Sequence, residues 1–377
     1  MLKSVGILGG ASLIEEANRE LSVEESVFLT VRQALANVGL GREQIDTVVQ
    51  CADDVLDGIS INHVYQVEAA ASYLKDESKV ERDGAWGVMY AMAKLLTGKF
   101  QTAMVVAYSK ASQIGYSAFS GMSTDPFFLR PVGADGDGLA ALQAQYYMQS
   151  SGATEQDFAE LAAASRGRAG RNPRIMEGQG MEISARDVLN SAPIADPIRE
   201  LSRARAGDGC VVLILASEEF IKANSLEATR IRGLGFASDA YYPTFRKLDE
   251  VTSAKVAVQK ASQQSGLNPA DVDFAEVQEV YAHQEMMLYE SLGLSGSSSG
   301  PEWFRSSRDG RGVPVNPSGG TMCSHVPYAT GLMRLYEAHL QIMGEAGPVQ
   351  LGKADLGLVH AQAGLAMQSN IAFFLER

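Results

Sequence analysis

One histidine has the setting that proton-transfer chemistry needs. His325 follows a glycine-rich segment at 316–320 and precedes an apolar run that begins at Ala329. Histidine changes its charge near neutral pH and can act as a general acid or base. We therefore expect His325 at the start of a buried helix, either as a catalytic group or as a histidine that only caps or packs. The glycines before it allow close approach to a ligand, or simply a tight turn.

A second set of candidate catalytic side chains is the run Gln278, Glu279 and Tyr281, which directly follows a predicted buried strand. Burial can raise the pKa of a carboxyl group into the range of a general base. A tyrosine can donate a hydrogen bond to a developing oxyanion, and a glutamine amide is also a donor. Glu279 and Tyr281 are equally well explained as a solvated acid and a packed aromatic ring.

Asp83 and Cys323 offer chemistry, but each has a simpler explanation. Asp83 precedes a predicted helix at 85–96 and is a candidate catalytic acid, although an N-cap is the commoner role. Cys323 lies two residues before His325, yet a buried cysteine is usually inert. The three cysteines of the chain are too few for a disulfide framework or a four-thiolate zinc site, and we expect no metal in this chain.

The elements that would position these residues form two similar halves. In the first, helices at 22–38 and 85–96 alternate with strands at 4–8, 47–51 and 103–108. The same order and spacing return after residue 230, which indicates an internal duplication. The rhythm predicts an α/β fold with a mainly parallel, buried sheet. We divide the chain into a half at 1–225, with an inserted lobe at about 109–205, and a half at 226–377.

Composition limits the possible partners. The chain has 377 residues, with 45 acidic and 32 basic side chains and a net charge of −13. A field of that sign repels phosphate backbones, so we expect no nucleic-acid partner. Without a run of about 20 apolar residues we also expect no membrane partner, and a cytoplasmic protein. The arginine-rich stretch at 166–174 could meet phosphates, although a solvated helix face is the commoner explanation.

At this point the chain resembles the thiolase superfamily, and within it the group similar to the sterol carrier protein X thiolase. The matching segments are Asn316-Pro317-Ser318-Gly319-Gly320, His325 followed by Ala329-Thr330-Gly331, Asp208-Gly209 before an apolar strand, Glu290 to Leu294, and Asp125-Pro126 with Arg130-Pro131. The resemblance implies a duplicated αβαβα five-layered core with an inserted lobe. It also implies a homodimer or larger assembly, and an acyl-CoA substrate that brings coenzyme A as part of itself.

The sequence departs from that family at the catalytic centre. Family thiolases carry a nucleophilic cysteine at the start of the buried helix of the first half, where the helix dipole favours the thiolate. Aligning the motif glycine on Gly87 places Gly84 at the cysteine position. Gln278 stands where the family has an asparagine or histidine that binds an oxyanion. A ping-pong mechanism through an acyl-cysteine is therefore not expected.

Two functions remain open. In the first, the protein is an enzyme that makes or cleaves a carbon–carbon bond of an acyl-CoA, by retro-aldol or Claisen-type chemistry, without an acyl-cysteine. His325 with Glu279 or Tyr281 would supply base and donor. The residues expected at the substrate and coenzyme A are Gly84, Asn316, Ser318, Gly319, Gly320 and Tyr328. This function is proposed by analogy with cysteine-free relatives of the group, which cleave steroid side chains together with a zinc-ribbon/OB-fold partner.

In the second function, the chain is an inactive thiolase-like subunit. It would stabilise a cysteine-bearing thiolase paralogue or a zinc-ribbon partner in a hetero-oligomer. A retained pocket that holds His325 would favour the enzyme. A collapsed pocket filled by Trp86 or Tyr328 would favour the subunit.

Overall fold

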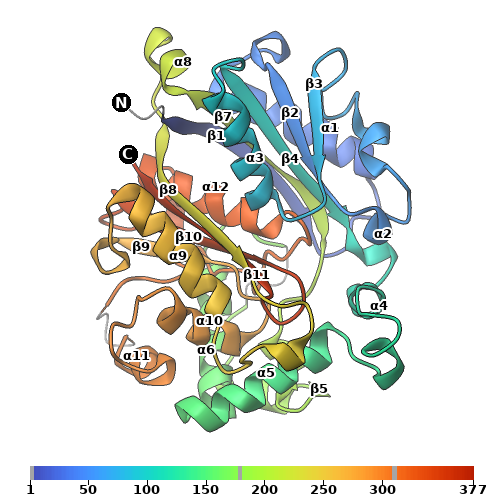
Figure 1. Ribbon diagram of the computed structural model, residues 1–377, viewed down its shortest axis with the longest axis vertical. Helices are drawn as coiled ribbons and strands as arrows, with labels where there is room; N and C mark the ends of the chain where they lie inside the picture. Colours follow the sequence, from blue (N-terminus) through green and yellow to red (C-terminus); the bar gives the residue numbers. More distant parts are fainter. Residues whose placement is uncertain (1–3, 177–180, 308–311) are drawn as a thin grey trace.

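The computed structural model describes residues 4–176, 181–307 and 312–377 (Figure 1). Its centre is a nine-stranded sheet in the order β3-β2-β4-β7-β1-β8-β11-β10-β9. From one edge to the other, the strands are β3 (Asp76–Val80), β2 (Thr47–Cys51), β4 (Thr102–Lys110), β7 (Asp208–Ser217), β1 (Val5–Glu15), β8 (Thr229–Ser238), β11 (Ser369–Glu376), β10 (Leu356–Ala363) and β9 (Phe274–Val277). A separate hairpin pairs β5 (Pro193–Ala195) with β6 (Ile198–Arg199).

The expectation of a mainly parallel sheet is wrong. Strand β2 is parallel to β3 and β4, and β9 is parallel to β10. The strands β7, β1, β8 and β11, which fill the middle of the sheet, pair antiparallel with one another and with their outer neighbours. The helix-linked strands at the two edges therefore obey the βαβ rule, while the central strands return the chain in the opposite direction.

The first strand is also longer than predicted. It continues past Gly9 and Gly10 to Glu15, with a register shift between Ile7 and Gly9. A Cβ atom on Gly10 would lie 2.2 Å from the backbone oxygen of Val212. These glycines therefore allow β1 to lie close to β7, instead of ending the strand.

The outer helix α1 (Val23–Val38) forms as its sequence predicts. Ser22 is its N-cap, with a capping box completed by Glu25, and Gly39 ends the helix in a left-handed conformation. Helix α9 (Thr252–Ser265) takes a similar place in the second half, where it covers β8 and β11. Both predicted helices are confirmed.

Two central helices lie near the middle of the molecule. Helix α3 (Gly84–Leu96) packs on β2 and β4, and α12 (Thr330–Met343) packs on β10, β9 and β1. The two helices also contact each other, and residues 330–342 are all buried. Apolar side chains from both helices and both halves of the sheet form one core cluster.

The inserted lobe is mainly helical. It contains α4 (Tyr116–Met122), α5 (Gly136–Ser151), α6 (Glu155–Ala169) and α7 (Ala185–Asn190). Helices α5 and α6 pack on α10 (Ala282–Ser291), so the lobe closes against the second half, as Figure 1 shows at the lower end of the molecule. The remaining α-helices are α2 (Asp54–Asp57), α8 (Glu218–Ala223) and α11 (Gly300–Ser307).

Short 3₁₀ turns connect these elements. They are Arg42–Gln44, Asn62–Gln66, Ala111–Gln113, Arg130–Val132, Glu200–Ser202, Pro243–Phe245, Pro269–Asp271 and Gly347–Val349. Across the described ranges, none of the helices is both long enough and apolar enough to cross a membrane.

Candidate active site

A cavity of about 290 Å³ opens where the two central helices begin. Four of the residues singled out in the sequence line it: Asp83, Gln278, His325 and Tyr328. They come from the starts of α3 and α12 and from the loop after β9. Segments 278, 325–328 and 83 are far apart in the chain, and the fold brings them to one wall.

His325 is held as a neutral proton acceptor. Its Nδ1 lies 2.9 Å from the Thr330 hydroxyl oxygen, and that hydroxyl donates its own hydrogen to the Val326 carbonyl at 2.7 Å. Nδ1 must therefore carry the proton and donate it to Thr330, which leaves the lone pair on Nε2. Burial, together with the positive charge of Arg203, lowers the pKa of His325 to about 4. At neutral pH its imidazole is uncharged and can accept a proton.

Tyr328 forms part of the cavity wall in a strained conformation. Its φ of +66° lies in the left-handed region, which a bulky residue rarely adopts. Contacts of both its backbone and its side chain hold it there. Its carbonyl accepts the Gly84 N–H at 2.7 Å, its hydroxyl donates to Asp53, and its ring meets Phe119 edge-on at 6.4 Å. The ring stands at the wall and leaves the cavity open.

Asp83 caps both central helices. One carboxylate oxygen accepts the Ala85 N–H at 2.9 Å, and the other accepts the Gly331 N–H at 2.8 Å. The side chain is only 4% exposed, and burial raises its pKa to about 7. It therefore combines the expected N-cap role with a protonation equilibrium near neutral pH.

Position 84 has no space for a side chain. A Cβ atom there would lie 2.7 Å from the Cβ of Leu332 and 2.9 Å from the Cβ of Ala107. The positions of both Cβ atoms are set by the backbones of α12 and β4. A side chain at this position would therefore need α3 to move away from both elements.

The three cysteines are all buried. Burial raises the pKa of Cys323 to about 11 and that of Cys210 to about 12, and it raises the pKa of Cys51 still further. At neutral pH these groups are thiols, which are poor nucleophiles.

Gln278 is fixed by a second glutamine at the cavity. Its side-chain oxygen accepts the Gln362 N–H at 3.1 Å, and its carbonyl accepts the Gln362 side-chain amide at 2.8 Å. With the side-chain oxygen engaged, the Gln278 amide nitrogen is the end that can donate to a ligand. Gln362 also lines the cavity.

Glu279 and Tyr281 do not line the cavity. Glu279 accepts hydrogen bonds from the Asn316 side chain at 2.9 Å and from the Thr321 backbone at 2.8 Å. Burial, followed by the charge of Glu285, raises its pKa to about 8. The Tyr281 hydroxyl donates to Asp137 at 2.8 Å, in the inserted lobe. Both residues hold loops against their surroundings.

The segment at 316–320 is buried and does not line this cavity. Asn316 accepts the Val277 N–H at 2.8 Å, and Ser318 donates to Glu276 at 2.7 Å. A Cβ atom on Gly319 would lie 2.4 Å from Ala169, and one on Gly320 would lie 2.5 Å from Glu279. Both glycines have positive φ. The structure therefore explains the two glycines by close packing inside a turn.

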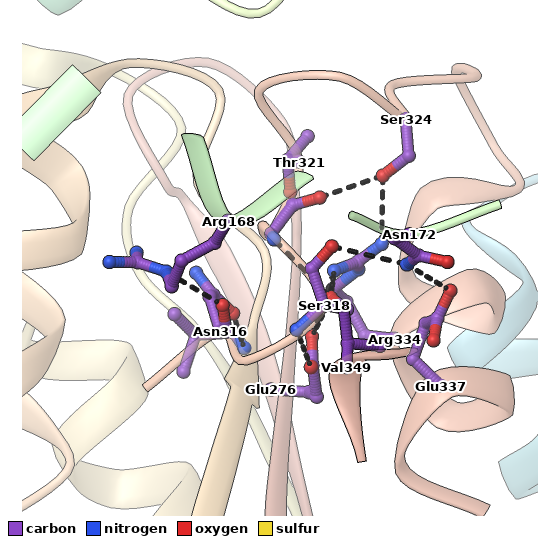
Figure 2. Close-up of polar contacts among 12 residues, drawn as sticks. Arg168, Asn172, Glu276, Asn316, Ser318, Thr321, Ser324, Arg334, Glu337 and Val349 are labelled. Atoms are coloured by element: carbon purple, nitrogen blue, oxygen red, sulfur yellow. Dashed lines mark hydrogen bonds and ion pairs between the residues drawn. The ribbon is translucent and has the colours of Figure 1, made fainter. Parts of the chain in front are cut away.

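Arg334 is the centre of this buried network (Figure 2). Its guanidinium is 1% exposed and donates to Glu276 at 2.8 Å, to Ser318 at 2.7 Å and to Ser324 at 2.8 Å. Glu276 belongs to β9, the strand at one edge of the sheet, and Ser324 directly precedes His325. One buried arginine thus ties the strand, the turn and the His325 loop together.

The arginine-rich stretch is not a solvated helix face. Arg166 is buried and donates to the carbonyls of Leu201 and Arg203. Arg174 forms an ion pair of 2.7 Å with the fully buried Glu337. Arg174 thus joins the inserted lobe to the core, and Arg166 ties segments of the lobe together. Arg171 is exposed.

Sequence reasoning missed Asp53 and Arg334. Asp53 follows a predicted strand, which is where ligand-facing residues gather in a parallel sheet, and that position was the available signal. Arg334 is a single arginine within an apolar helical run, and such an isolated charge calls for a buried partner. Among the described residues, no group of three or more His, Cys, Asp and Glu side chains could hold a metal ion.

The chain is similar to thiolases in sequence. Residues 238–376 match the family described as thiolase C-terminal domain-like. Acetyl-CoA acetyltransferase of Methanothermobacter thermautotrophicus is 27% identical over 240 residues, which cover 63% of this chain and 62% of that protein. Sterol carrier protein 2 of Oryctolagus cuniculus is 30% identical over 224 residues, which cover 57% of this chain and 40% of that protein. The chain thus spans only part of the length of these relatives.

Solved structures confirm the expected fold class. A structure titled Ltp2-ChsH2(DUF35) aldolase matches with a TM-score of 0.84 and 24% identity, over 99% of this chain and 97% of that one. A monomeric SCP2-thiolase-like protein of type 1 from Mycobacterium smegmatis matches with a TM-score of 0.74 and 15% identity, over 99% and 76%. The fold is thiolase-like.

Proposed function

We propose that this protein acts on an acyl-CoA and cleaves or forms a carbon–carbon bond without an acyl-cysteine. Retro-aldol cleavage of a 3-hydroxyacyl-CoA is the reaction that best suits the site. The observation that carries the proposal is the closure of position 84 by Leu332 and Ala107, beside a cavity that keeps His325 in its wall. A retro-aldol step needs a base and donors for an enolate, but no nucleophile.

His325 is the proposed base. Its Nε2 lone pair takes the proton of the 3-hydroxyl group, and the bond between C2 and C3 breaks as the C3 carbonyl forms. The electron pair moves onto the thioester, which becomes an enolate. The protonated imidazole then returns its proton to C2, so that the released acyl-CoA is neutral at that carbon. The enolate charge stabilises the imidazolium, and this offsets the lowered pKa of the empty site.

Gln278 and Tyr328 would position the substrate. The Gln278 amide nitrogen can donate to the thioester oxygen, because its own oxygen is engaged by Gln362. Tyr328, whose hydroxyl donates to Asp53, would shape the part of the wall against which the substrate lies. The structural role we propose for the buried residues Glu279, Asn316 and Ser318 is to fix the position of the loops that form the cavity wall.

The names of the similar proteins support the acyl-CoA class. One sequence relative is called an acetyl-CoA acetyltransferase, and one structural neighbour is titled an aldolase with ChsH2(DUF35). We accordingly propose coenzyme A as part of the substrate and a DUF35-type protein as a partner.

Product analysis tests this function. The purified chain, alone and together with a DUF35 protein from its host, is incubated with a panel of 3-hydroxyacyl-CoA esters, and the acyl-CoA products are separated by mass. We expect a shortened acyl-CoA and an aldehyde or ketone. H325A should lower kcat/KM by about 10²- to 10³-fold. H63A, the same change in a histidine outside the cavity, should have no effect. Equal activity of H325A and the native chain would refute the assignment.

A second candidate function is that of an inactive subunit. Phe127, Phe128 and Phe245 are each more than 70% exposed, which is typical of a surface that meets another protein. Native mass spectrometry of the complex purified from its host separates the two functions. Fixed stoichiometry with a cysteine-bearing thiolase paralogue, and no activity in the chain itself, would favour the subunit.

A further inference from the structure

A second, larger cavity is lined in part by Val315 and Pro317. Its volume is about 680 Å³, and it is bounded by α6, α10, α11 and the turn Gly347–Val349. Its lining includes Arg168, Arg171, Tyr289, Trp303, Val349 and Leu351. None of its described lining residues belongs to the first cavity.

We propose that this second cavity binds a small molecule with an aromatic or similarly apolar body and an anionic group. Its volume is within the range of about 300–1,000 Å³ that is usual for small-molecule sites. Alanine, valine, proline and leucine make up half of the described lining residues. Tyr289 and Trp303, whose ring centroids are 4.4 Å apart, add an aromatic face.

The charges of the inner wall are already satisfied. Glu285 is 1% exposed, and it accepts hydrogen bonds from the Tyr289 hydroxyl at 2.5 Å and from the Asn316 side chain at 2.8 Å. Arg168 lies 3.7 Å from Glu285 and donates to the Asn316 carbonyl at 3.0 Å, a contact that Figure 2 also shows. This wall is therefore preorganised and does not require a charged ligand group.

Arg171 supplies the anionic preference. It lines the cavity and is exposed, and within the described ranges its guanidinium has neither a hydrogen bond nor an ion pair. Its planar fork of donors matches a carboxylate, sulfonate or phosphate. An anion at Arg171 with its apolar body against Trp303 would use both features of the site.

Calorimetry with a matched pair of probes tests this proposal without any assay of the first cavity. The probes are naphthalene-2-sulfonate and the uncharged 2-naphthylmethanol. We expect the native chain to bind the sulfonate at least about tenfold more tightly, which corresponds to about 1.4 kcal/mol. R171Q should lose that preference and leave the affinity for the alcohol unchanged. R32Q, the same change at an exposed arginine of α1, should bind both probes like the native chain.

Two filling variants locate the probe. A164W places a large side chain on the exposed face of α6 that lines the second cavity, and it should abolish binding of both probes. S123W narrows the mouth of the first cavity and should leave binding unchanged. Binding that survives A164W or is lost in S123W would overturn the proposal, as would an R171Q variant that keeps the preference for the sulfonate. Failure of the sulfonate to bind the folded native chain would also overturn it.

Discussion

Asp83 is hydrogen-bonded to Gly331 across 248 positions of the chain, at 2.8 Å. The same carboxylate accepts the Ala85 N–H, so one buried side chain caps α3 from the first half and α12 from the second. The candidate active site lies where these two helix starts meet. The duplicated architecture therefore has a direct consequence for function, because the partial positive charges of two helix N-termini converge on one cavity.

Replacing Asp83 should loosen this junction. D83A removes the acceptor of two buried N–H groups, and we expect a loss of about 2–3 kcal/mol in the free energy of unfolding. D135A removes the N-cap of α5, which bonds Gly138 at a partly exposed position, and should cost about 1 kcal/mol. Urea denaturation of both variants measures the difference. Equal losses would show that the shared cap adds nothing.

Position 84 should not tolerate any side chain. We expect G84A and G84C each to lower the free energy of unfolding by about 1–3 kcal/mol, because their Cβ atoms would overlap Leu332 and Ala107. Gly167 offers a matched control, since a Cβ atom on this helical glycine meets no atom within 4 Å. G167A should be neutral or stabilising by up to about 1 kcal/mol. A stable G84C variant would mean that the site has room for a nucleophile.

Glu279 should make stability depend on pH. Its pKa is raised from 4.5 to about 8 in the folded chain, so the folded state holds a proton between those values that the unfolded state has lost. The native chain should therefore lose stability, relative to E279Q, as the pH rises from about 5 to about 8, by an amount on the order of 2 kcal/mol. Denaturation curves of the two proteins across this range provide the measurement. Parallel curves would contradict the assignment.

The buried pair of Arg334 and Glu276 should be costly to break. E276Q leaves the guanidinium without its charged partner in a site that is 1% exposed, and we expect a loss of about 3–5 kcal/mol. K222A, which breaks an exposed pair with Glu218, should cost less than about 1 kcal/mol. Thermal unfolding of the two variants compares these effects. A small loss in E276Q would show that the network does not hold the wall.

The sequence predicts local structure well where the signals are local. Ser22 with Glu25 and the periodic run that ends at Ser265 are complete within a few residues, and both helices form as expected. The sequence also predicts the setting of His325 between a glycine-rich turn and a buried helix, and in the structure this residue lines the cavity.

The sequence did not predict the contacts between distant segments of the chain. Tyr328 and Asp53 are 275 positions apart, and no local pattern connects them. Because Glu279 is adjacent to Gln278, the sequence suggested that both side chains lie at the cavity. The Glu279 side chain instead points toward Asn316 and Thr321, which donate hydrogen bonds to it. Strand direction in the middle of the sheet likewise depends on where the inserted lobe returns the chain.

The dependence of carbon–carbon cleavage on free coenzyme A tests the central claim most directly. A 3-hydroxyacyl-CoA and the matching 3-ketoacyl-CoA are each incubated with the protein, with and without added coenzyme A and after iodoacetamide treatment. The proposed mechanism predicts cleavage of the hydroxy substrate that needs no free coenzyme A and survives iodoacetamide, and no cleavage of the keto substrate. Cleavage of the keto substrate that requires free coenzyme A and is abolished by iodoacetamide would show that a cysteine carries the reaction.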